Sequence, residues 1–225
     1  VHGVMTGVRD REQRYRLNRM DIATPDGQPV RWALNMLHGA DLHDQVRGTT
    51  LSLSVLNAAA AEGLPVFFYG SSSQTLAKLV AAVEERVPGI EVAGTEQSKF
   101  RTADPAERAE IAARIVASGA RIVFVGLGCP RQEQFLFAFR DLLPMPALGV
   151  GAAFDYLAGT LPEPPERMRR MGLEWLWRLK LEPRRLWRRY LLLNPAYLTL
   201  MTLQLARAWR PDPQGDVPRE TPVSV

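Results

Sequence analysis

The sequence has little of several features that mark other classes of protein. Its 225 residues include a single cysteine, Cys129, so no disulfide can form within the chain and a disulfide-rich secreted fold is excluded. The longest apolar stretch, residues 191–206, is interrupted by polar residues and a proline, and it is too short and too polar to predict a membrane span. The three histidines lack the spacing of metal ligands and no Asp-x-Asp pair occurs, so the sequence gives no reason to expect a metal.

Two phosphate-binding signatures are also missing. Neither the dinucleotide pattern GxGxxG nor the Walker pattern GxxxxGK[ST] follows any candidate strand, which argues against an NAD(P)-dependent oxidoreductase. A hydrophobic content of 46% and a charged content of 23% exclude a disordered or collagen-like chain. The length suits one large domain or two small ones with a real core.

Positive charge is present but unevenly distributed. The net charge is +4, and 25 of the 28 basic residues are arginine. Residues 161–210 carry a net +7 and the rest of the chain a net −3, and four of the five tryptophans lie in the same basic segment. A chain with an acidic body and a basic, aromatic end usually contacts something anionic at that end.

Short apolar runs alternate with helical patterns between residues 65 and 154. This alternation predicts an α/β fold with a Rossmann-like, mostly parallel sheet whose strands are joined by right-handed crossovers. The predicted strands span residues 65–69, 90–93, 121–126 and 147–154, and the predicted helices between them span 75–86, 105–118 and a segment that ends near 142.

Two loops follow predicted strands and open predicted helices, which is where ligands of open α/β sheets bind. The N–H groups at the start of such helices suit a diphosphate. The candidate residues for binding a donor are Gly70, Ser71, Ser72, Gly126, Gly128, Arg131 and Gln132. The alternative is ordinary strand-to-helix turn chemistry with serine N-caps, and the residues alone leave the two interpretations about even.

Two carboxylates are candidates for a general base. Asp26 lies in the sequence TPDGQP, whose composition is typical of a type I or II turn, and a plain turn is the simpler interpretation. The functional interpretation is a carboxylate presented on a loop, able to accept a proton. Asp155 follows the last predicted strand, where it can instead cap the next turn. Cys129 is interpreted as a small loop residue, because no histidine lies near it in the sequence.

After residue 160 the character of the chain changes. A proline-rich hinge precedes a predicted helix to about residue 181, a break at Glu182-Pro183, and a second helix that Pro195 breaks or kinks. The predicted organisation is an α/β core at 1–160, a basic helical appendage at 161–210 and a disordered tail at 211–225.

The appendage contains a candidate anion-binding face. Arg178, Arg185 and Arg188 share one helical face if the helix is nearly continuous, and their planar guanidinium groups suit phosphate. The interleaved Trp and Tyr favour a membrane interface. Nucleic acid competes for the same charges, and a solvated basic helix with its tryptophans in the core is the plain alternative.

These segments occur in the order found in one family. The chain resembles the WecG/TagA/CpsF family of bacterial glycosyltransferases in PDG near the start, VFFYGSS before a helix, FVGLGCPRQE, GVGAAFDYLAGT and EWLWRLKLEPRRLWRRY. The resemblance runs from the first residues to about Tyr197, and GLGCPRQE and the EWLWR segment are its most specific parts. It implies an α/β core with a C-terminal appendage that docks on the membrane.

The resemblance also implies an activity. The expected enzyme is an inverting, metal-independent glycosyltransferase without a cofactor. It takes a sugar from a UDP-sugar, commonly UDP-N-acetylmannosamine or its uronic acid, and adds it to a polyprenyl-diphosphate-linked sugar in the synthesis of a cell-surface polysaccharide or wall polymer. We expect it to be cytoplasmic and peripheral on the inner face of the plasma membrane, with no nucleic acid as a partner.

Residue roles follow from the same resemblance. Asp26 is the expected base, Gln132 is expected near the donor sugar, and the appendage arginines are expected to grip the lipid diphosphate. Family members usually carry a strand–helix–strand segment before this start, with a threonine near the active site, so we expect that segment to be missing here. The alternatives are a non-catalytic membrane- or polyanion-binding module on a nucleotide-binding core, and an enzyme that uses UDP-glucose or another hexose.

Overall fold

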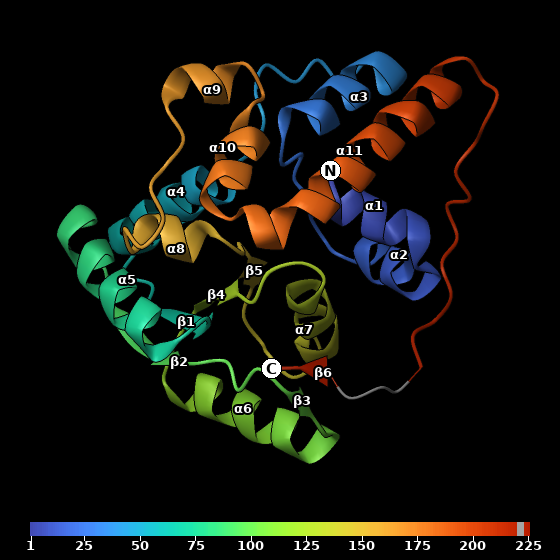
Figure 1. Ribbon diagram of the computed structural model, residues 1–225. Helices are drawn as coiled ribbons and strands as arrows, with labels where there is room; N and C mark the ends of the chain where they lie inside the picture. The colour runs from blue at the N-terminus through green and yellow to red at the C-terminus, as the bar shows by residue number, and fades with distance from the viewer. Residues whose placement is uncertain (220–222) are drawn as a thin grey trace. The chain divides into compact units, whose positions relative to one another are not determined.

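The computed structural model describes residues 1–219 and 223–225, and the chain divides into two compact units (Figure 1). The first unit consists of residues 1–47 and 163–217, and the second of residues 48–162 and 218–225. This division differs from the predicted boundary at residue 160. The first 47 residues form helices that pack with the C-terminal helices, so they belong to the unit of the predicted appendage.

The second unit contains the predicted parallel sheet. Its four strands are β1 (Val66–Gly70), β2 (Val92–Glu96), β4 (Ile122–Gly126) and β5 (Ala147–Gly149), in the order β2-β1-β4-β5, and every neighbouring pair is parallel. All five residues of β1 are buried, as expected for a central strand covered on both faces. The predicted α/β class with a parallel sheet is therefore confirmed.

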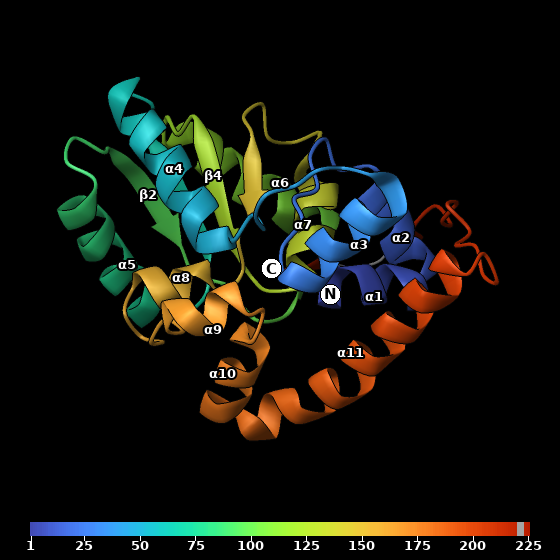
Figure 2. The ribbon, with the colours of Figure 1, turned by 90° about the horizontal axis from the view of Figure 1, so that it is seen from above.

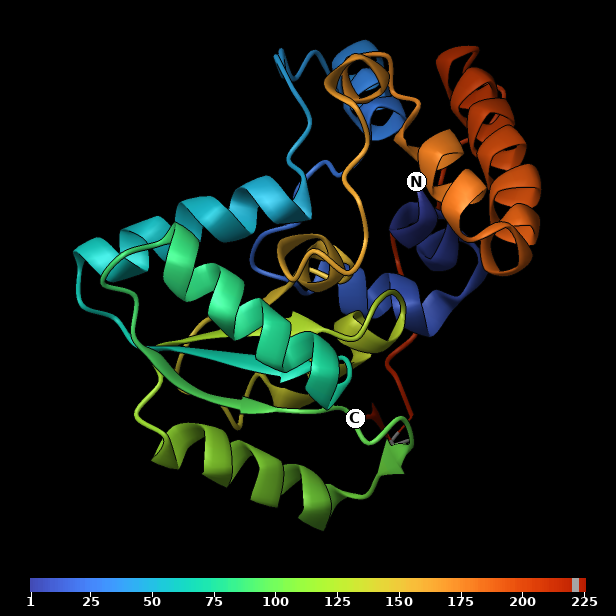
Figure 3. The same cartoon turned by 60° about the vertical axis from the view of Figure 1, so that its left-hand side comes forward.

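Helices cover both faces of this sheet (Figure 3). One face packs against α4 (Gly48–Ala61), α5 (Ser73–Arg86) and α8 (Ala153–Leu157), and the other against α6 (Pro105–Ala117) and α7 (Arg131–Phe139). Alternate residues of β1 point to opposite faces, so Phe68 contacts Phe124 and Phe154 while Tyr69 stacks on Phe135 at 4.5 Å between ring centroids.

The last strand is shorter than predicted. The expected strand at 147–154 ends at Gly149, because Gly151 adopts a φ of +53° and turns the chain into α8. A second, two-stranded sheet pairs β3 (Thr102–Ala103) antiparallel with β6 (Val223–Ser224).

The first unit is helical. It contains α1 (His2–Arg9), α2 (Arg11–Asn18), α3 (Gln28–His38), α9 (Glu166–Arg170), α10 (Glu174–Leu181) and α11 (Pro183–Leu205), and α11 runs alongside α1 and α3 (Figure 2). The small core between these three helices consists of Met5, Ala33, Leu193 and Tyr197. None of the helices in residues 1–219 and 223–225 combines the length and the hydropathy of a membrane span.

Two expectations about the C-terminal helices have different outcomes. The predicted break falls at Glu182, whose φ of −130° and ψ of 57° separate α10 from α11. Pro195, expected to break or kink the second helix, lies inside a continuous α11 instead. Leu193 and Tyr197 flank it and are buried, and this packing outweighs the one backbone hydrogen bond that proline removes.

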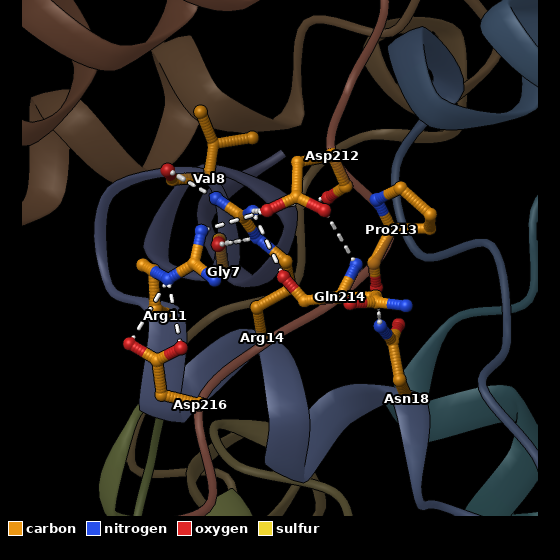
Figure 4. Close-up of polar contacts among 9 residues, drawn as sticks. All are labelled: Gly7, Val8, Arg11, Arg14, Asn18, Asp212, Pro213, Gln214 and Asp216. Carbon is orange, nitrogen blue, oxygen red and sulfur yellow. Dashed lines mark hydrogen bonds and ion pairs between the residues drawn. The ribbon is translucent and has the colours of Figure 1, made fainter.

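The segment after α11 differs from the predicted disorder. Asp212 and Asp216 form ion pairs with Arg11 at 2.7 and 2.9 Å, and the Arg14 guanidinium donates to the carbonyl oxygens of Gly7 and Asp212 (Figure 4). The prediction overlooked these acidic residues, whose negative charges attract the arginines of α2. The part of the predicted tail at residues 220–222 lies outside the described residues.

Candidate active site

Three strand ends converge at the carboxyl edge of the parallel sheet in the second unit. A Cβ atom added to Gly70 would lie 3.0 Å from the backbone of Gly126, and one added to Gly126 would lie 2.3 Å from the ring of Phe154. Only glycine fits at these two points, so β1, β4 and the turn into α8 approach each other closely. Two of the three glycines predicted for donor binding, Gly70 and Gly126, are therefore brought together.

The serine loop after β1 has the helix N-cap that was the alternative to a binding role. Ser72 is the N-cap of α5, and its hydroxyl oxygen accepts a hydrogen bond from the Thr75 N–H at 3.2 Å. Ser71 has a φ of +61°, which is uncommon outside glycine. Capping of α5 and anion binding at its N-terminus are compatible, because the cap satisfies one N–H of the first turn while others still point outward.

The loop after β4 presents an acceptor in addition to N–H groups. The Gln132 amide nitrogen donates to Glu133 Oε1 at 3.1 Å and to the Gly149 carbonyl oxygen at 3.4 Å. Its Oε1 is buried and has no hydrogen-bond partner among the described residues. Buried polar atoms in proteins are nearly always hydrogen-bonded, so this oxygen marks the loop as a candidate functional position. Gly128, with φ +73°, and Arg131, at the start of α7, complete this loop.

Asp155, the rival base, lies in α8 in the same unit. Its carboxylate accepts a hydrogen bond from the Thr160 hydroxyl at 3.4 Å, and its carbonyl oxygen accepts from the Thr160 and Leu161 N–H groups. These contacts fit the alternative interpretation, in which Asp155 holds the following turn.

Asp26 lies in the first unit, in the turn that precedes α3. Gly27, with a φ of +95°, is the N-cap of α3. The Pro25 carbonyl oxygen accepts a hydrogen bond from the Val46 N–H at 3.1 Å, so residues 42–47 are joined to the turn. Arg31 fastens that segment further by donating to the carbonyl oxygens of residues 42 and 43. The loop that carries Asp26 is therefore held from two sides.

The Asp26 carboxyl is subject to opposing electrostatic influences. Asp26 is open to water on one side, but the crowding of protein atoms around its loop removes enough hydration to raise its pKa above the usual range. The positive charges of Arg47, Arg178 and Arg189 act in the opposite direction and lower it. A carboxyl with a raised pKa amid arginines is typical of a functional carboxylate.

Sequence reasoning missed Arg47. Its side chain is only 12% exposed, and its guanidinium lies 3.2 Å from Glu174 and 3.6 Å from Glu163. Glu174 also accepts a hydrogen bond from the Gln45 side chain at 2.6 Å. Because these partners are more than 100 residues away along the chain, no local pattern could have indicated them.

The three appendage arginines lie on two helices, and Glu182 joins two of them, because its Oε2 pairs with both Arg178 and Arg185. Arg178 lies in α10, and its Nε is buried without a hydrogen-bond partner among the described residues. Arg185 and Arg188 lie in α11 and are exposed. The first is paired with Glu182, and the second lies over the Trp187 ring at 5.4 Å. The break at Glu182 removes the continuous helix on which the predicted face depended. Of the three, Arg178 is the one whose charge acts on Asp26, and Arg189, which the sequence did not single out, joins it.

Within residues 1–219 and 223–225, no group of three His, Cys, Asp or Glu side chains is arranged to hold a metal ion.

Comparison with known proteins identifies the class. The family model described as "Glycosyl transferase WecG/TagA/CpsF family" matches residues 1–211. An N-acetylglucosaminyldiphosphoundecaprenol N-acetyl-beta-D-mannosaminyltransferase of Bacillus spizizenii is 34% identical over 202 residues, covering 89% of this chain and 76% of the relative. A protein of the same name from Bacillus subtilis is 28% identical over 211 residues, covering 93% of this chain and 80% of the relative. The predicted resemblance is confirmed, and the chain belongs to the WecG/TagA/CpsF family and is a glycosyltransferase.

Proposed function

We propose that the enzyme transfers an N-acetylmannosamine-type sugar from a UDP-sugar to N-acetylglucosamine linked to a polyprenyl diphosphate, with inversion and without a metal. The acceptor and the transferred sugar follow the names of the two relatives. The observation that carries the proposal is the placement of Asp26, a carboxyl with a raised pKa, in the same compact unit as Arg178 and Arg189, whose charges reach it. A base beside a cluster of arginines suits an acceptor that has a hydroxyl to deprotonate and a diphosphate to hold.

The reaction is a direct displacement in which Asp26 takes the acceptor proton. The acceptor oxygen forms a bond to the anomeric carbon as the bond from that carbon to the UDP oxygen breaks, and the bonding electrons leave with UDP. One displacement inverts the anomeric centre. Because its pKa is raised, the ionised carboxylate of Asp26 is a stronger base than that of an ordinary aspartate.

The strand-end loops are proposed to bind the donor. The N-termini of α5 and α7 present N–H groups and positive dipole ends that favour the negative charge developing on UDP. The unpartnered Oε1 of Gln132 is proposed to accept a hydrogen bond from a hydroxyl or amide of the sugar.

The helices α9 to α11 are proposed to bring the enzyme to its lipid acceptor as a membrane-docking appendage. A groove of about 400 Å³ between α9 and α10 is lined by Met168, Leu176, Trp177, Leu179 and Lys180. The neighbouring α11 exposes Trp187, Leu191 and Leu192 at 48%, 59% and 59%. Exposed apolar and aromatic groups next to arginines suit the surface of an anionic membrane, the inner face of the plasma membrane in this proposal.

The test is a transfer assay with a panel of UDP-sugars and polyprenyl-diphosphate-linked N-acetylglucosamine, with and without EDTA. We expect product with UDP-N-acetylmannosamine, a β linkage, and the same rate in EDTA. Preference for UDP-glucose would overturn the donor, loss of activity in EDTA would overturn metal independence, and a retained anomeric configuration would overturn the single displacement.

A further inference from the structure

The loop that follows β2 carries an exposed aromatic ring in a strained backbone conformation. Phe100 has a φ of +53°, and 61% of it is exposed. A positive φ is uncommon for a bulky residue, and a large apolar ring gains little from exposure to water. Such outliers concentrate at functional positions, where the surrounding structure maintains them.

Hydrogen bonds hold Phe100 in this conformation. Its N–H donates to the hydroxyl oxygen of Ser98 at 3.1 Å, and the Ser98 hydroxyl, which is buried, donates to the carbonyl oxygen of Val225 at 2.8 Å. The Val225 N–H in turn donates to the carbonyl oxygen of Arg101 at 2.9 Å. The loop is therefore fixed on both sides of the ring, so the ring is presented to water in a defined place.

Both candidate donor loops contact this segment. The Ser98 N–H donates to the carbonyl oxygen of Ser71, in the loop after β1, at 3.1 Å. The guanidinium of Arg131, at the start of the helix after β4, lies 5.9 Å from the centroid of the Phe100 ring. The exposed ring thus adjoins both loops that are proposed to hold the diphosphate of the donor.

We propose that Phe100 is the stacking platform for the nucleobase of the donor, with Arg131 at the edge of the same site. This assignment rests on the proposed function and adds the residue that would bind the base. A nucleobase and a phenyl ring stack through their flat faces, and a neighbouring guanidinium strengthens such a site by cation–π contact. A nucleoside diphosphate would place its base on Phe100 and its phosphates at the N-termini of α5 and α7.

The experiment measures binding of UDP, UMP and inorganic pyrophosphate to the full chain by calorimetry. Removal of the ring in Phe100→Ala should weaken the binding of UDP and of UMP by about 5- to 150-fold, the usual contribution of one stacked base. The affinity for pyrophosphate should stay unchanged. Phe100→Trp should restore binding. Phe100→Gly removes the ring and also suits the positive φ, so it should bind as poorly as the alanine variant without losing thermal stability.

Phe137→Ala is the matched control, because Phe137 also lies under an arginine, Arg140, at 4.8 Å in the same unit. It should bind all three ligands as the wild type does. Unchanged UDP affinity in Phe100→Ala and Phe100→Gly, or an equal loss for UDP and pyrophosphate, would overturn the platform.

A parallel panel of ADP, GDP and CDP separates the stacking role of Phe100 from the proposed UDP donor. Tight binding of another nucleotide that depends on Phe100 would keep the platform and refute the UDP donor, and no nucleotide binding at all would refute both.

Discussion

Asp26 shows how one side chain can be prepared for proton transfer by opposing influences. Crowding around the turn raises the pKa of its carboxyl, while Arg47, Arg178 and Arg189 keep the ionised form accessible. An aspartate with an ordinary pKa would hold the acceptor proton only weakly, and a fully buried aspartate would remain protonated. Asp26 combines desolvation, which raises its pKa, with neighbouring positive charges, which lower it.

The raised pKa has a cost in stability that Asp26→Asn should reveal. Where the folded pKa exceeds the unfolded one, the native state binds more protons, so the free energy of unfolding falls as pH rises from about 4 through the folded pKa. The asparagine variant lacks this fall. We expect its Tm to equal that of the wild type near pH 4 and to exceed it by up to about 2 °C at pH 7.5, a small gain because water screens the carboxylate. The raised pKa of Asp26 would be contradicted if the Tm of Asp26→Asn matched that of the wild type at pH 4 and fell below it at pH 7.5.

Removal of the Arg47 charge should move the pH dependence of catalysis. Arg47→Gln deletes a positive charge that lowers the pKa of Asp26, and it leaves Glu163 and Glu174 without that partner, so the pKa of Asp26 rises further. We expect the acid limb of the kcat/KM profile to move to higher pH, so that the ratio of kcat/KM at pH 8 to that at pH 5.5 grows by about threefold or more.

The matched control for Arg47 is Arg114→Gln, which breaks an ion pair with Glu96 at 2.7 Å in the other compact unit. Its profile should overlay that of the wild type. An Arg47→Gln profile that falls uniformly at all pH values would show a loss of structure and not a change in the Asp26 carboxyl.

At the scale of elements, burial sorts the arginines of α10 and α11 into two sets, because Arg178 and Arg189 are half-buried. Arg178 and Arg189 act on Asp26, whereas Arg185 and Arg188 are exposed. Glu182 stands at the break and pairs with Arg178 and Arg185, at 3.6 Å in the first case. The first set therefore suits the acceptor diphosphate, and the second suits the headgroups of the membrane.

This division predicts different losses for the two sets. Arg178→Gln should lower kcat/KM for the lipid-linked acceptor by about 10- to 100-fold, the usual value of a charged hydrogen bond, with little change in binding to anionic vesicles. The double variant Arg185→Gln and Arg188→Gln should weaken vesicle binding by about 30-fold, roughly 1 kcal/mol per charge, with a smaller effect on transfer to a short-chain soluble acceptor. Vesicle sedimentation and transfer assays measure the two effects. Equal losses in both assays for both variants would contradict the division.

The elements that could be predicted are those whose signal is local. β1 and β4 are unbroken apolar runs that end in glycine, and their loops were placed correctly at one edge of the sheet. The helix α4, rich in Ser, Thr and Ala, gives a weak periodic signal, and α11 continues through a proline that local rules would not allow. Arg47 and Phe100 contact partners distant in sequence, Glu174 and Arg131, so no spacing pattern could have identified these contacts.

At the scale of the whole molecule, the two compact units divide the predicted residues by role. The donor loops belong to the unit with the parallel sheet, and Asp26 belongs to the helical unit with the basic segment that gives the chain its net positive charge. The predicted boundary at residue 160 kept Asp26 in the sheet domain. The observed division instead groups the proposed base with the arginines proposed to hold the acceptor.

The central claim is that Asp26 removes the acceptor proton, and the rate of sugar transfer by Asp26→Asn tests it most directly. With saturating UDP-N-acetylmannosamine and polyprenyl-diphosphate-linked N-acetylglucosamine, we expect kcat to fall by about 10²- to 10⁴-fold, the usual contribution of a general base. The affinity for UDP should not change, because the donor loops lie in the other compact unit. Asp155→Asn serves as the comparison and should retain most of the activity. An unchanged kcat in Asp26→Asn together with a large loss in Asp155→Asn would contradict the account and assign the base to Asp155.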